Sequence, residues 1–191
     1  MSAVLTDRFD EALGYAARLH RDQRRKGTEV PYVAHLLGVA SLALEMGADE
    51  DGAIAALLHD AVEDQDVTVD EIADRWGDTV AAIVADCTDS HGPSKAPWRE
   101  RKEAYLAALP AKPASSLLVS LADKTYNARA IVDDLRVHGE TLWTRFSGGR
   151  ESLWYYRGLA EVFRAALPGA GAERFAGVVD DMHRLAGAAH A

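Results

Sequence analysis

The sequence predicts an all-α fold, and three observations support this prediction. Apolar residues recur every three or four positions through almost the whole chain, as they do on the buried side of helices. Residues typical of helix ends stand between these periodic segments. No two segments alternate apolar and polar residues as paired strands would. Because the chain has 191 residues and 48% of them are hydrophobic, we expect a single compact helical bundle, one domain covering 1–191.

In the N-terminal half, the periodicity predicts helices over 5–23, 34–47, 50–64, 68–76 and 78–88. The fourth of these has the clearest beginning, because Thr68 is followed three positions later by Glu71, which is the spacing of a capping box. Gly77 stands where this helix should end, since glycine readily adopts the backbone conformation found after helix C-termini.

In the C-terminal half, the periodicity predicts helices over 97–109, 114–137, 150–167 and 171–188. Gly139 and Gly169 stand where two of these helices should stop. Two segments lack helical periodicity, "DSHGPSKAP" at 89–97 and "HGETLWTRFSGG" at 138–149. Both join helices, and connections of this kind often overhang a functional site.

The composition argues against several classes of protein. Cys87 is the single cysteine, which excludes an intrachain disulfide and a zinc–cysteine site and fits a reducing cytoplasm. The N-terminus lacks the apolar block of a signal peptide, and no window reaches the roughly 18 apolar residues of a membrane span. The net charge of −9 argues against nucleic acid or a membrane surface as a partner. We expect a cytoplasmic protein, of undetermined oligomeric state, that binds a small molecule.

A group of polar residues ends the apolar run "AALLHDAVED" at 55–64. On a continuous helix, His59, Asp60, Glu63 and Asp64 would span roughly 140° of the circumference, so that one side packs and the other presents a polar strip. Glu63 and Asp64 are equally consistent with the solvated face of a surface helix. His59 beside Asp60 fits that interpretation less well, because an imidazole next to a carboxylate is a good ligand pair for a divalent cation.

Further ligands must come from other helices. His35 lies in the apolar segment "PYVAHLLGVASLAL", where a lone histidine is more often a satisfied core residue. Asp123 lies within "SLLVSLADKTYNARAIV", with Asn127 one helical turn later. A buried aspartate needs a cation or several hydrogen bonds. One explanation accounts for these polar residues on apolar helices, namely that His35, Asp123, His59 and Asp60 converge on one metal ion.

Three motifs carry a family resemblance, in the order "HRDQRRKGTEVPYVAH", "LLHDAVED" and "LADKTYNAR". The ordered set H…HD…D resembles the HD superfamily of metal-dependent phosphohydrolases. The flanking residues are similar to the hydrolase domain of the Rel/Spo homologue family, which handles the alarmones ppGpp and pppGpp. The resemblance runs from about residue 20 to 130 and implies an HD-domain helical bundle, which the helices at 150–188 complete. Long members carry a synthetase domain after the hydrolase. We expect none here, since only about 60 residues follow Arg129.

The resemblance implies a role for each motif. It implies that a single Mn²⁺ is bound by His35, His59, Asp60 and Asp123, and this ligand type suits manganese. It implies that Glu63 and Asp64 orient and deprotonate the attacking water. In "RRKG", it implies that Arg25 stacks on the purine base, with Arg24 as the alternative and Lys26 beside them. Without the resemblance, these cations would be read as a solvated helix end favoured by the helix dipole.

Other implied contacts lie towards the C-terminus. Asn127 matches a position that contacts the nucleotide sugar or phosphate. Lys124 and Arg129 are cations in the same motif, and at most one is expected to reach phosphate, because neighbouring positions on a helix point apart.

The segment "WTRFSGGRESLWYYRGL" carries the remaining candidates. Tyr155 falls near a family tyrosine that lines the nucleotide pocket, whereas we expect Trp154 and Tyr156 to pack in the core. Arg145 and Arg150 are alternative candidates for contact with the distal phosphates.

The sequence thus predicts an Mn²⁺-dependent enzyme that hydrolyses ppGpp or pppGpp to GDP or GTP and pyrophosphate. One alternative keeps the site and changes the substrate to an adenosine alarmone or to the 2′-phosphate of NADPH. Another is a non-catalytic module that binds alarmone, and the presence of both Glu63 and Asp64 favours catalysis over that role. A cyclic dinucleotide phosphodiesterase of the HD type is disfavoured, because the Gly-Tyr-Pro motif is absent.

Overall fold

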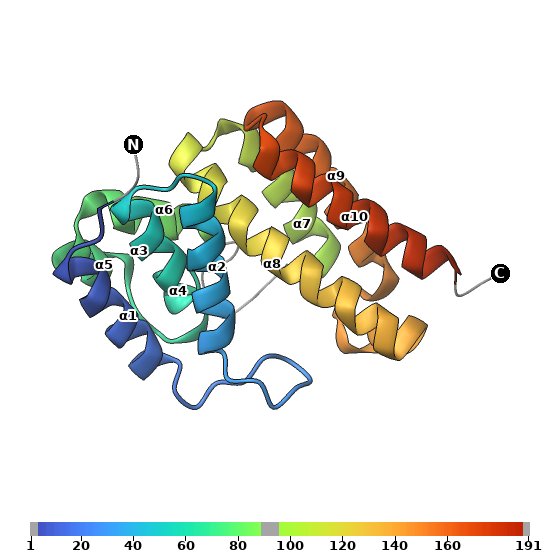
Figure 1. Cartoon of the computed structure of the whole chain (residues 1–191), viewed down its shortest axis with the longest axis horizontal. Helices are drawn as coiled ribbons and strands as arrows, with labels where there is room; N and C mark the ends of the chain where they lie inside the picture. Colours follow the sequence, from blue (N-terminus) through green and yellow to red (C-terminus); the bar gives the residue numbers. More distant parts are fainter. Residues whose placement is uncertain (1–3, 89–95, 189–191) are drawn as a thin grey trace. The chain divides into compact units, whose positions relative to one another are not determined.

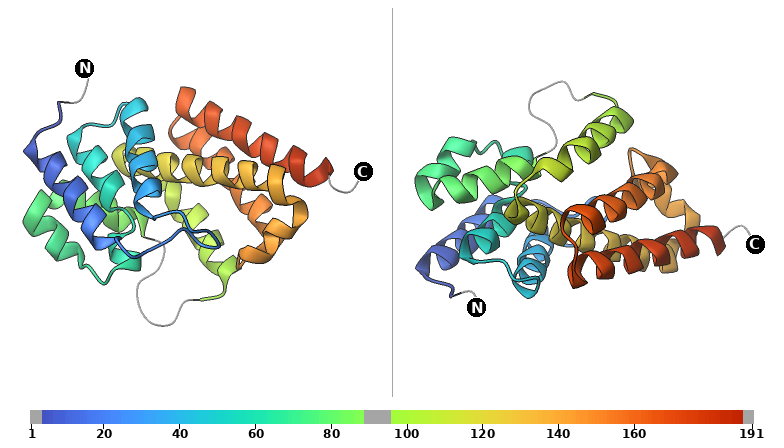
Figure 2. Two further views of the ribbon diagram at one scale, coloured as in Figure 1. Left: turned by 60° about the horizontal axis from the view of Figure 1, so that its bottom comes forward. Right: turned by 90° about the horizontal axis from the view of Figure 1, so that it is seen from above.

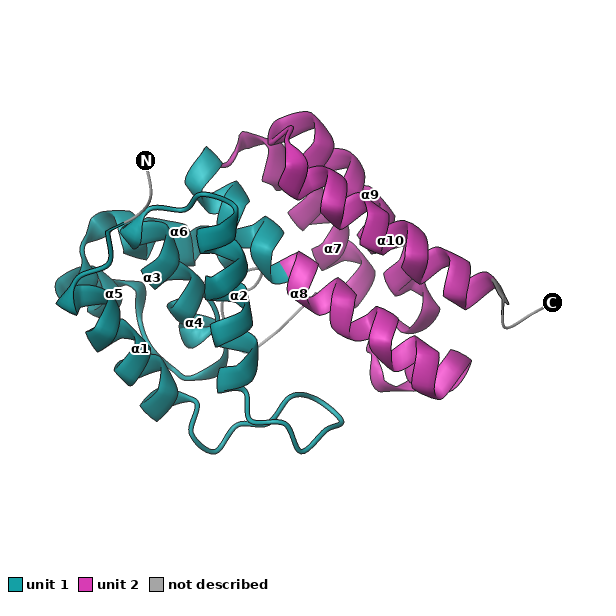
Figure 3. Cartoon of the chain, in the orientation of Figure 1, with its two compact units in different colours: residues 1–93, 113–123 teal, residues 94–112, 124–191 magenta. Residues whose placement is uncertain are grey.

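The computed structural model describes residues 4–88 and 96–188. These residues form α-helices and short 3-10 helices, with no strand among them, so the all-α prediction is confirmed. None of the helices in this part of the chain is long and apolar enough to cross a membrane. Contacts divide the chain into two compact units, unit 1 with residues 1–93 and 113–123 and unit 2 with residues 94–112 and 124–191 (Figure 3). The single-domain boundary at 1–191 stays a prediction.

Unit 1 is built around one central helix. Its helices are α1 (Asp7–Leu19), α2 (Val33–Glu45), α3 (Glu50–Leu58), α4 (Ala61–Asp64), α5 (Val69–Trp76), α6 (Asp78–Cys87) and the first part of α8 (Ala114–His138). The helices α1, α2 and α6 all pack against α3 (Figure 1). Every residue of α3 from Gly52 to Leu58 is therefore buried.

The predicted continuous helix over 50–64, with a polar strip along one side, is wrong. The helix α3 ends at Leu58 and is buried all round, and a separate turn, α4, begins at Ala61. Between them, Asp60 has φ −99° and ψ 0°, outside the α-helical range. The carbonyl of Ala56, which would accept the amide of residue 60 in a continuous helix, lies 2.9 Å from Nδ1 of His59. The His59 side chain thus takes the carbonyl that the backbone amide of Asp60 would use in a continuous helix, and α3 stops here.

The helix ends follow the capping signals with one exception. Thr68 and Glu71 form the predicted capping box at the start of α5. Gly77, with φ 92°, lies between α5 and α6, and Gly139, with φ 56°, follows α8, as predicted. Gly169 is the exception, because it precedes α10 and its carbonyl accepts the amide of Glu173 in the first turn.

Unit 2 packs its last two helices against each other. It holds α7 (Trp98–Ala108), η1 (Leu109–Ala111), the rest of α8, η2 (Gly139–Arg145), η3 (Gly149–Glu151), α9 (Ser152–Ala166) and α10 (Ala170–Ala188). The helices α9 and α10, orange-red and red in Figure 2, pack against each other. The rings of Phe163 and Phe175 meet edge to face between them.

Two predictions about irregular segments and aromatic residues are settled in this unit. The segment 138–149 forms 3-10 turns, whereas residues 89–95 of the other irregular segment lie outside the described residues. Tyr156 is buried as expected. Trp154 is only half-buried, and the guanidinium of Arg99 lies 3.4 Å from the centre of its ring, so the expected core position of Trp154 is wrong.

Candidate functional site

The first candidate ligand, His35, stands in the first turn of α2, and its side chain is buried. The backbone holds this helix start against the segment that precedes it. The amide of Tyr32 donates to the carbonyl of Gln23 at 3.0 Å, and the amide of His35 donates to the carbonyl of Tyr32 at 2.9 Å. The chain before α2 therefore fixes where the imidazole of His35 points.

The next two candidates, His59 and Asp60, follow the end of α3. Because Nδ1 of His59 donates to the carbonyl of Ala56, the neutral ring carries a lone pair on Nε2. Oδ2 of Asp60 lies 2.9 Å from this Nε2 and 3.4 Å from Nε2 of His35. The break after α3 thus brings two adjacent residues to one place, which a regular helix would not do.

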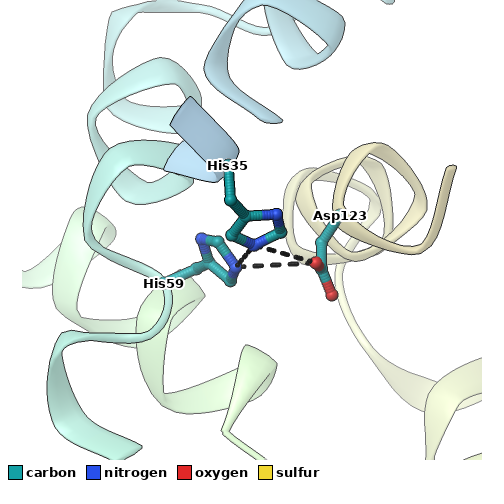
Figure 4. A group of neighbouring side chains, drawn as sticks. All are labelled: His35, His59 and Asp123. Carbon is teal, nitrogen blue, oxygen red and sulfur yellow. Dashed lines mark hydrogen bonds and ion pairs between the residues drawn. The ribbon is translucent and has the colours of Figure 1, made fainter. Parts of the chain in front are cut away.

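The fourth candidate, Asp123, comes from α8. Its Oδ1 lies 3.4 Å from Nε2 of His35 and 3.6 Å from Nε2 of His59, and these two nitrogens are 3.2 Å apart (Figure 4). The three buried side chains offer ligand atoms that all lie within 4.8 Å of one another. The structure therefore brings His35, His59 and Asp123 together as the sequence predicted, with Asp60 beside both histidines.

The electrostatics of this cluster favour a bound cation. Burial would lower the pKa of His59, but the carboxylates of Asp60 and Asp123 outweigh burial and hold that pKa well above its ordinary value. Burial would raise the pKa of Asp60, but His59 and His35 hold it well below its ordinary value. Imidazole nitrogens and carboxylate oxygens facing each other repel unless a proton or a metal ion lies among them. Two imidazoles and two carboxylates fit a divalent metal.

Three residues around the cluster were missed by the sequence analysis. The hydroxyl of Tyr32 donates to Oδ2 of Asp60 at 2.5 Å, and burial together with the Asp60 carboxylate raises the pKa of Tyr32, which keeps this donor protonated. The Tyr32 ring stacks on the buried His20, with centroids 5.3 Å apart. Nδ1 of His20 lies 2.6 Å from Oε1 of Gln23. Their only signal in the sequence is their place inside the first motif.

Glu63 and Asp64, the predicted water-activating pair, lie on the short helix α4, directly after the candidate ligand Asp60. Glu63 is half-buried and Asp64 is exposed. The amide of Asp64 donates to the carbonyl of Asp60 at 2.9 Å, which links the two along the backbone. The carboxylate of Asp64 accepts a hydrogen bond of 2.8 Å from Nε2 of Gln23.

The basic residues of "RRKG" lie in a hairpin-like connection between α1 and α2. The amide of Arg25 donates to the carbonyl of Val30 at 2.9 Å, and an isolated antiparallel bridge joins Arg24 to Pro31. Since α1 ends at Leu19, the interpretation of these cations as a helix end is wrong. Arg25 is half-buried, whereas Arg24 is exposed. The guanidinium of Arg24 donates to the carbonyls of Arg21 and Gln23, each at 3.2 Å.

Unit 2 gathers lysines around buried tyrosines. The ammonium groups of Lys112 and Lys124 lie 4.9 Å and 5.4 Å from the ring centre of Tyr105, and that of Lys102 lies 5.1 Å from the ring centre of Tyr155. Tyr155 is 5% exposed. The sequence analysis named Lys124 and Tyr155 but missed the other two lysines and Tyr105. These three residues lie at 102–112, outside the three motifs that carry the resemblance.

Two further candidates follow Lys124 on α8. Asn127 is half-buried on α8, one turn after Asp123, and Arg129 is exposed. The assignment of either residue to the substrate stays a prediction.

Two arginines of unit 2 have structural partners. The guanidinium of Arg150 donates to Glu140 and, at 3.1 Å, to the carbonyl of Ala186. Arg145 lies 4.0 Å from the carboxylate of Asp134. These contacts give both arginines a structural role that requires no bound ligand. Their contact with phosphate stays a prediction.

Comparison with known proteins identifies the family. The HD domain family matches residues 12–154. The Drosophila melanogaster protein named guanosine-3′,5′-bis(diphosphate) 3′-pyrophosphohydrolase MESH1 is 35% identical over 157 residues, which cover 81% of this chain and 84% of that protein. The chain belongs to the HD-domain family. The human protein of the same name is 42% identical over 122 residues, which cover 62% of this chain and 66% of that protein.

A solved structure supports the same assignment. It is described as a metazoan orthologue of SpoT that hydrolyses ppGpp and plays a role in starvation responses. It matches with a TM-score of 0.76 at 32% identity and covers 95% of this chain and 97% of its own. The HD-domain fold and the resemblance drawn from the three motifs are therefore confirmed, and the protein is a hydrolase of this family.

Proposed function

We propose that this protein hydrolyses the 3′-pyrophosphate of ppGpp and pppGpp in an Mn²⁺-dependent reaction, which yields GDP or GTP and pyrophosphate. The observation that carries the proposal is the convergence of His35, His59 and Asp123, with Asp60 against both histidines. It is found in a chain whose Drosophila and human relatives are named as hydrolases of this pyrophosphate. The donor set supports a metal of the manganese type.

In this proposal, His35, His59, Asp60 and Asp123 hold the metal ion. When bound, such an ion supplies Lewis-acid stabilisation of phosphate charge and makes water more acidic. The protein contributes the orientation of the ligands. The Ala56 carbonyl fixes the ring of His59, and the Tyr32 hydroxyl fixes the carboxylate of Asp60.

Glu63 and Asp64 are the proposed acid–base pair. They lie on α4, immediately after the ligand Asp60, and an ionised carboxylate there can accept a proton from water as the oxygen attacks the phosphorus nearest the ribose 3′ oxygen. The bond from this phosphorus to the 3′ oxygen breaks, and pyrophosphate leaves with the oxygen of the attacking water. The 3′ oxygen takes up a proton and becomes the hydroxyl of GDP or GTP.

We propose that nucleotide binding uses cations and aromatic rings from both parts of the sequence. Arg25, or Arg24 in its place, stacks on the purine, with Lys26 nearby. Asn127, Lys124 and Tyr155 contact the sugar and phosphates. The support for Lys124 is its position in a group of three ammonium groups around Tyr105 and Tyr155, which suits an anionic ligand.

The test is a product assay on ppGpp, the corresponding adenosine alarmone and NADPH, each with Mn²⁺ and with chelator. Release of pyrophosphate and GDP from ppGpp, abolished by chelator, is expected. Turnover of only the adenosine compound or NADPH would move the proposal to that substrate. Binding of ppGpp without turnover of any of the three would identify an alarmone-binding module instead.

A further inference from the structure

Gln23 stands at the junction of the basic connection and the carboxylate pair. Its backbone carbonyl accepts the amide of Tyr32 at 3.0 Å, which closes the connection that carries Arg24 and Arg25. Its side chain points to α4, where Nε2 donates to Oδ2 of Asp64 at 2.8 Å. Gln23 thus contacts both the start of α2, the helix that carries the proposed ligand His35, and the proposed acid–base residue Asp64.

Neighbouring side chains set the orientation of the Gln23 amide. Oε1 accepts a hydrogen bond of 2.5 Å from Nε2 of Gln65 and lies 2.6 Å from Nδ1 of His20. An ionised carboxylate only accepts, so the end that faces Asp64 must be the NH₂ group. The buried ring of His20, stacked on Tyr32, leaves the amide little freedom to rotate. The donor is therefore aimed before any substrate binds.

The orientation of the Asp64 carboxylate depends on this hydrogen bond, because the helix that carries Asp64 gives its side chain little support. The helix α4 has four residues, and the Asp64 side chain is exposed. Within the described part of the chain, Gln23 is the only residue whose side chain hydrogen-bonds this carboxylate. Without it, the carboxylate is free to take other rotamers and to leave the orientation in which it meets water.

We propose that Gln23 is a positioning residue that holds the carboxylate of Asp64 for its task in hydrolysis. The inference rests on the proposed function and adds to it a residue that neither binds the metal nor contacts the reacting phosphorus.

The kinetic test uses Gln23→Met, which keeps the length of the side chain and removes its hydrogen bonds. Glu161→Met is the control, because it introduces the same methionine at an exposed position on α9, away from Gln23 and Asp64 in the sequence. With ppGpp and Mn²⁺, Gln23→Met is expected to lower kcat about 10- to 100-fold, by analogy with the loss of a residue that orients a metal ligand. KM, the Mn²⁺ dissociation constant and the kcat of the control should stay within about threefold of wild type.

A double-mutant cycle separates positioning from a general structural effect. In an Asp64→Ala background, Gln23→Met should change kcat by less than about threefold, because the group it orients is gone. Equal losses in both backgrounds, or a loss confined to KM or to Mn²⁺ binding, would overturn the inference.

A second cycle, on unfolding of the metal-free protein, needs no substrate. Coupling between Gln23 and Asp64 should change the unfolding equilibrium constant about 2- to 12-fold, as expected for one hydrogen bond. Absence of coupling overturns the inference even if ppGpp is hydrolysed. If coupling is present and only the adenosine alarmone or NADPH is hydrolysed, the proposed substrate fails, and the kinetic cycle is run on the nucleotide that turns over. A protein that hydrolyses none of the three overturns both.

Discussion

The two ring nitrogens of His59 have separate roles. Nδ1 donates to the Ala56 carbonyl at the end of α3, and Nε2 faces Asp60 and Asp123. The first contact fixes the tautomer, so the second nitrogen is available to a cation. The His59 side chain therefore both ends α3 and offers a nitrogen to the candidate metal site.

Glu63 and Asp64 allow water activation to be separated from metal binding. Glu63→Ala and Asp64→Ala should each retain Mn²⁺ and lower kcat by about 10² to 10⁴, the usual contribution of a general acid–base group. Metal content and kcat on ppGpp are measured together. Glu161→Ala, which removes an exposed carboxylate on α9, is the control and should behave as wild type. Loss of metal in either variant, or near-normal turnover, would contradict the assigned role.

Arg25 allows the stacking role of the basic connection to be tested. If its guanidinium stacks on the purine, Arg25→Ala should weaken affinity about 5- to 150-fold, the range for loss of a base-stacking side chain. The effect should fall on KM more than on kcat, because the contact is remote from the reacting phosphorus. Arg25→Lys keeps the charge but loses the planar group, so it should resemble Arg25→Ala.

Arg24→Ala provides the comparison, and we expect it to be milder because Arg24 is the more exposed side chain. An active Arg25→Lys with a crippled Arg24→Ala would show that Arg24 is the stacking residue. Normal KM in all three variants would exclude both.

At the scale of elements, Gly77 sets the turn between α5 and α6. Its φ of 92° with ψ of 163° is a conformation that residues with a Cβ rarely adopt, although nothing lies within 4 Å of the position a Cβ would take. The requirement for glycine is therefore conformational and independent of local space.

Gly77→Ala should consequently lower the free energy of unfolding by about 1–3 kcal/mol. Gly177→Ala is the matched control, since a Cβ at Gly177 also meets open space but the residue lies within α10. Alanine in a helix interior should raise the free energy of unfolding by about 0.5–1 kcal/mol. Denaturant unfolding of the two variants checks both signs, and a loss of equal size at the two positions would contradict the explanation.

At the scale of the whole molecule, the candidate metal site joins segments that are far apart in the sequence. His35 belongs to α2, His59 follows α3 and Asp123 belongs to α8. The folded state alone assembles them, so a metal ion that binds there must stabilise folding.

Mn²⁺ at about 100 times its dissociation constant should raise the free energy of unfolding by about 2.7 kcal/mol. His59→Ala and Asp123→Ala should bind little Mn²⁺ and lose this increment, whereas His138→Ala, which removes an exposed histidine on α8, should keep it. Metal analysis and unfolding with and without chelator provide the measurements. Full Mn²⁺ occupancy in both cluster variants would exclude the assigned ligands.

The sequence by itself determined the helical class, the approximate position of most helices and the polar residues that come together in the candidate metal site. Helical periodicity and caps such as Thr68 with Glu71 depend on neighbours within a few positions, so they can be read locally. His35 and Asp123 could be predicted because a polar residue on an otherwise apolar helix face requires a partner.

Only the tertiary structure decided the break between α3 and α4, the full burial of α3 and the contacts of His20, Gln23 and Tyr32. The burial of α3 depends on three other helices that surround it. Gln23 and Asp64 are 41 positions apart, and Tyr32 and Asp60 are 28 apart. A hydrogen bond between exposed or half-buried polar groups at such separations leaves no periodic pattern in the sequence, because it depends on where the packed helices bring the two chain segments together.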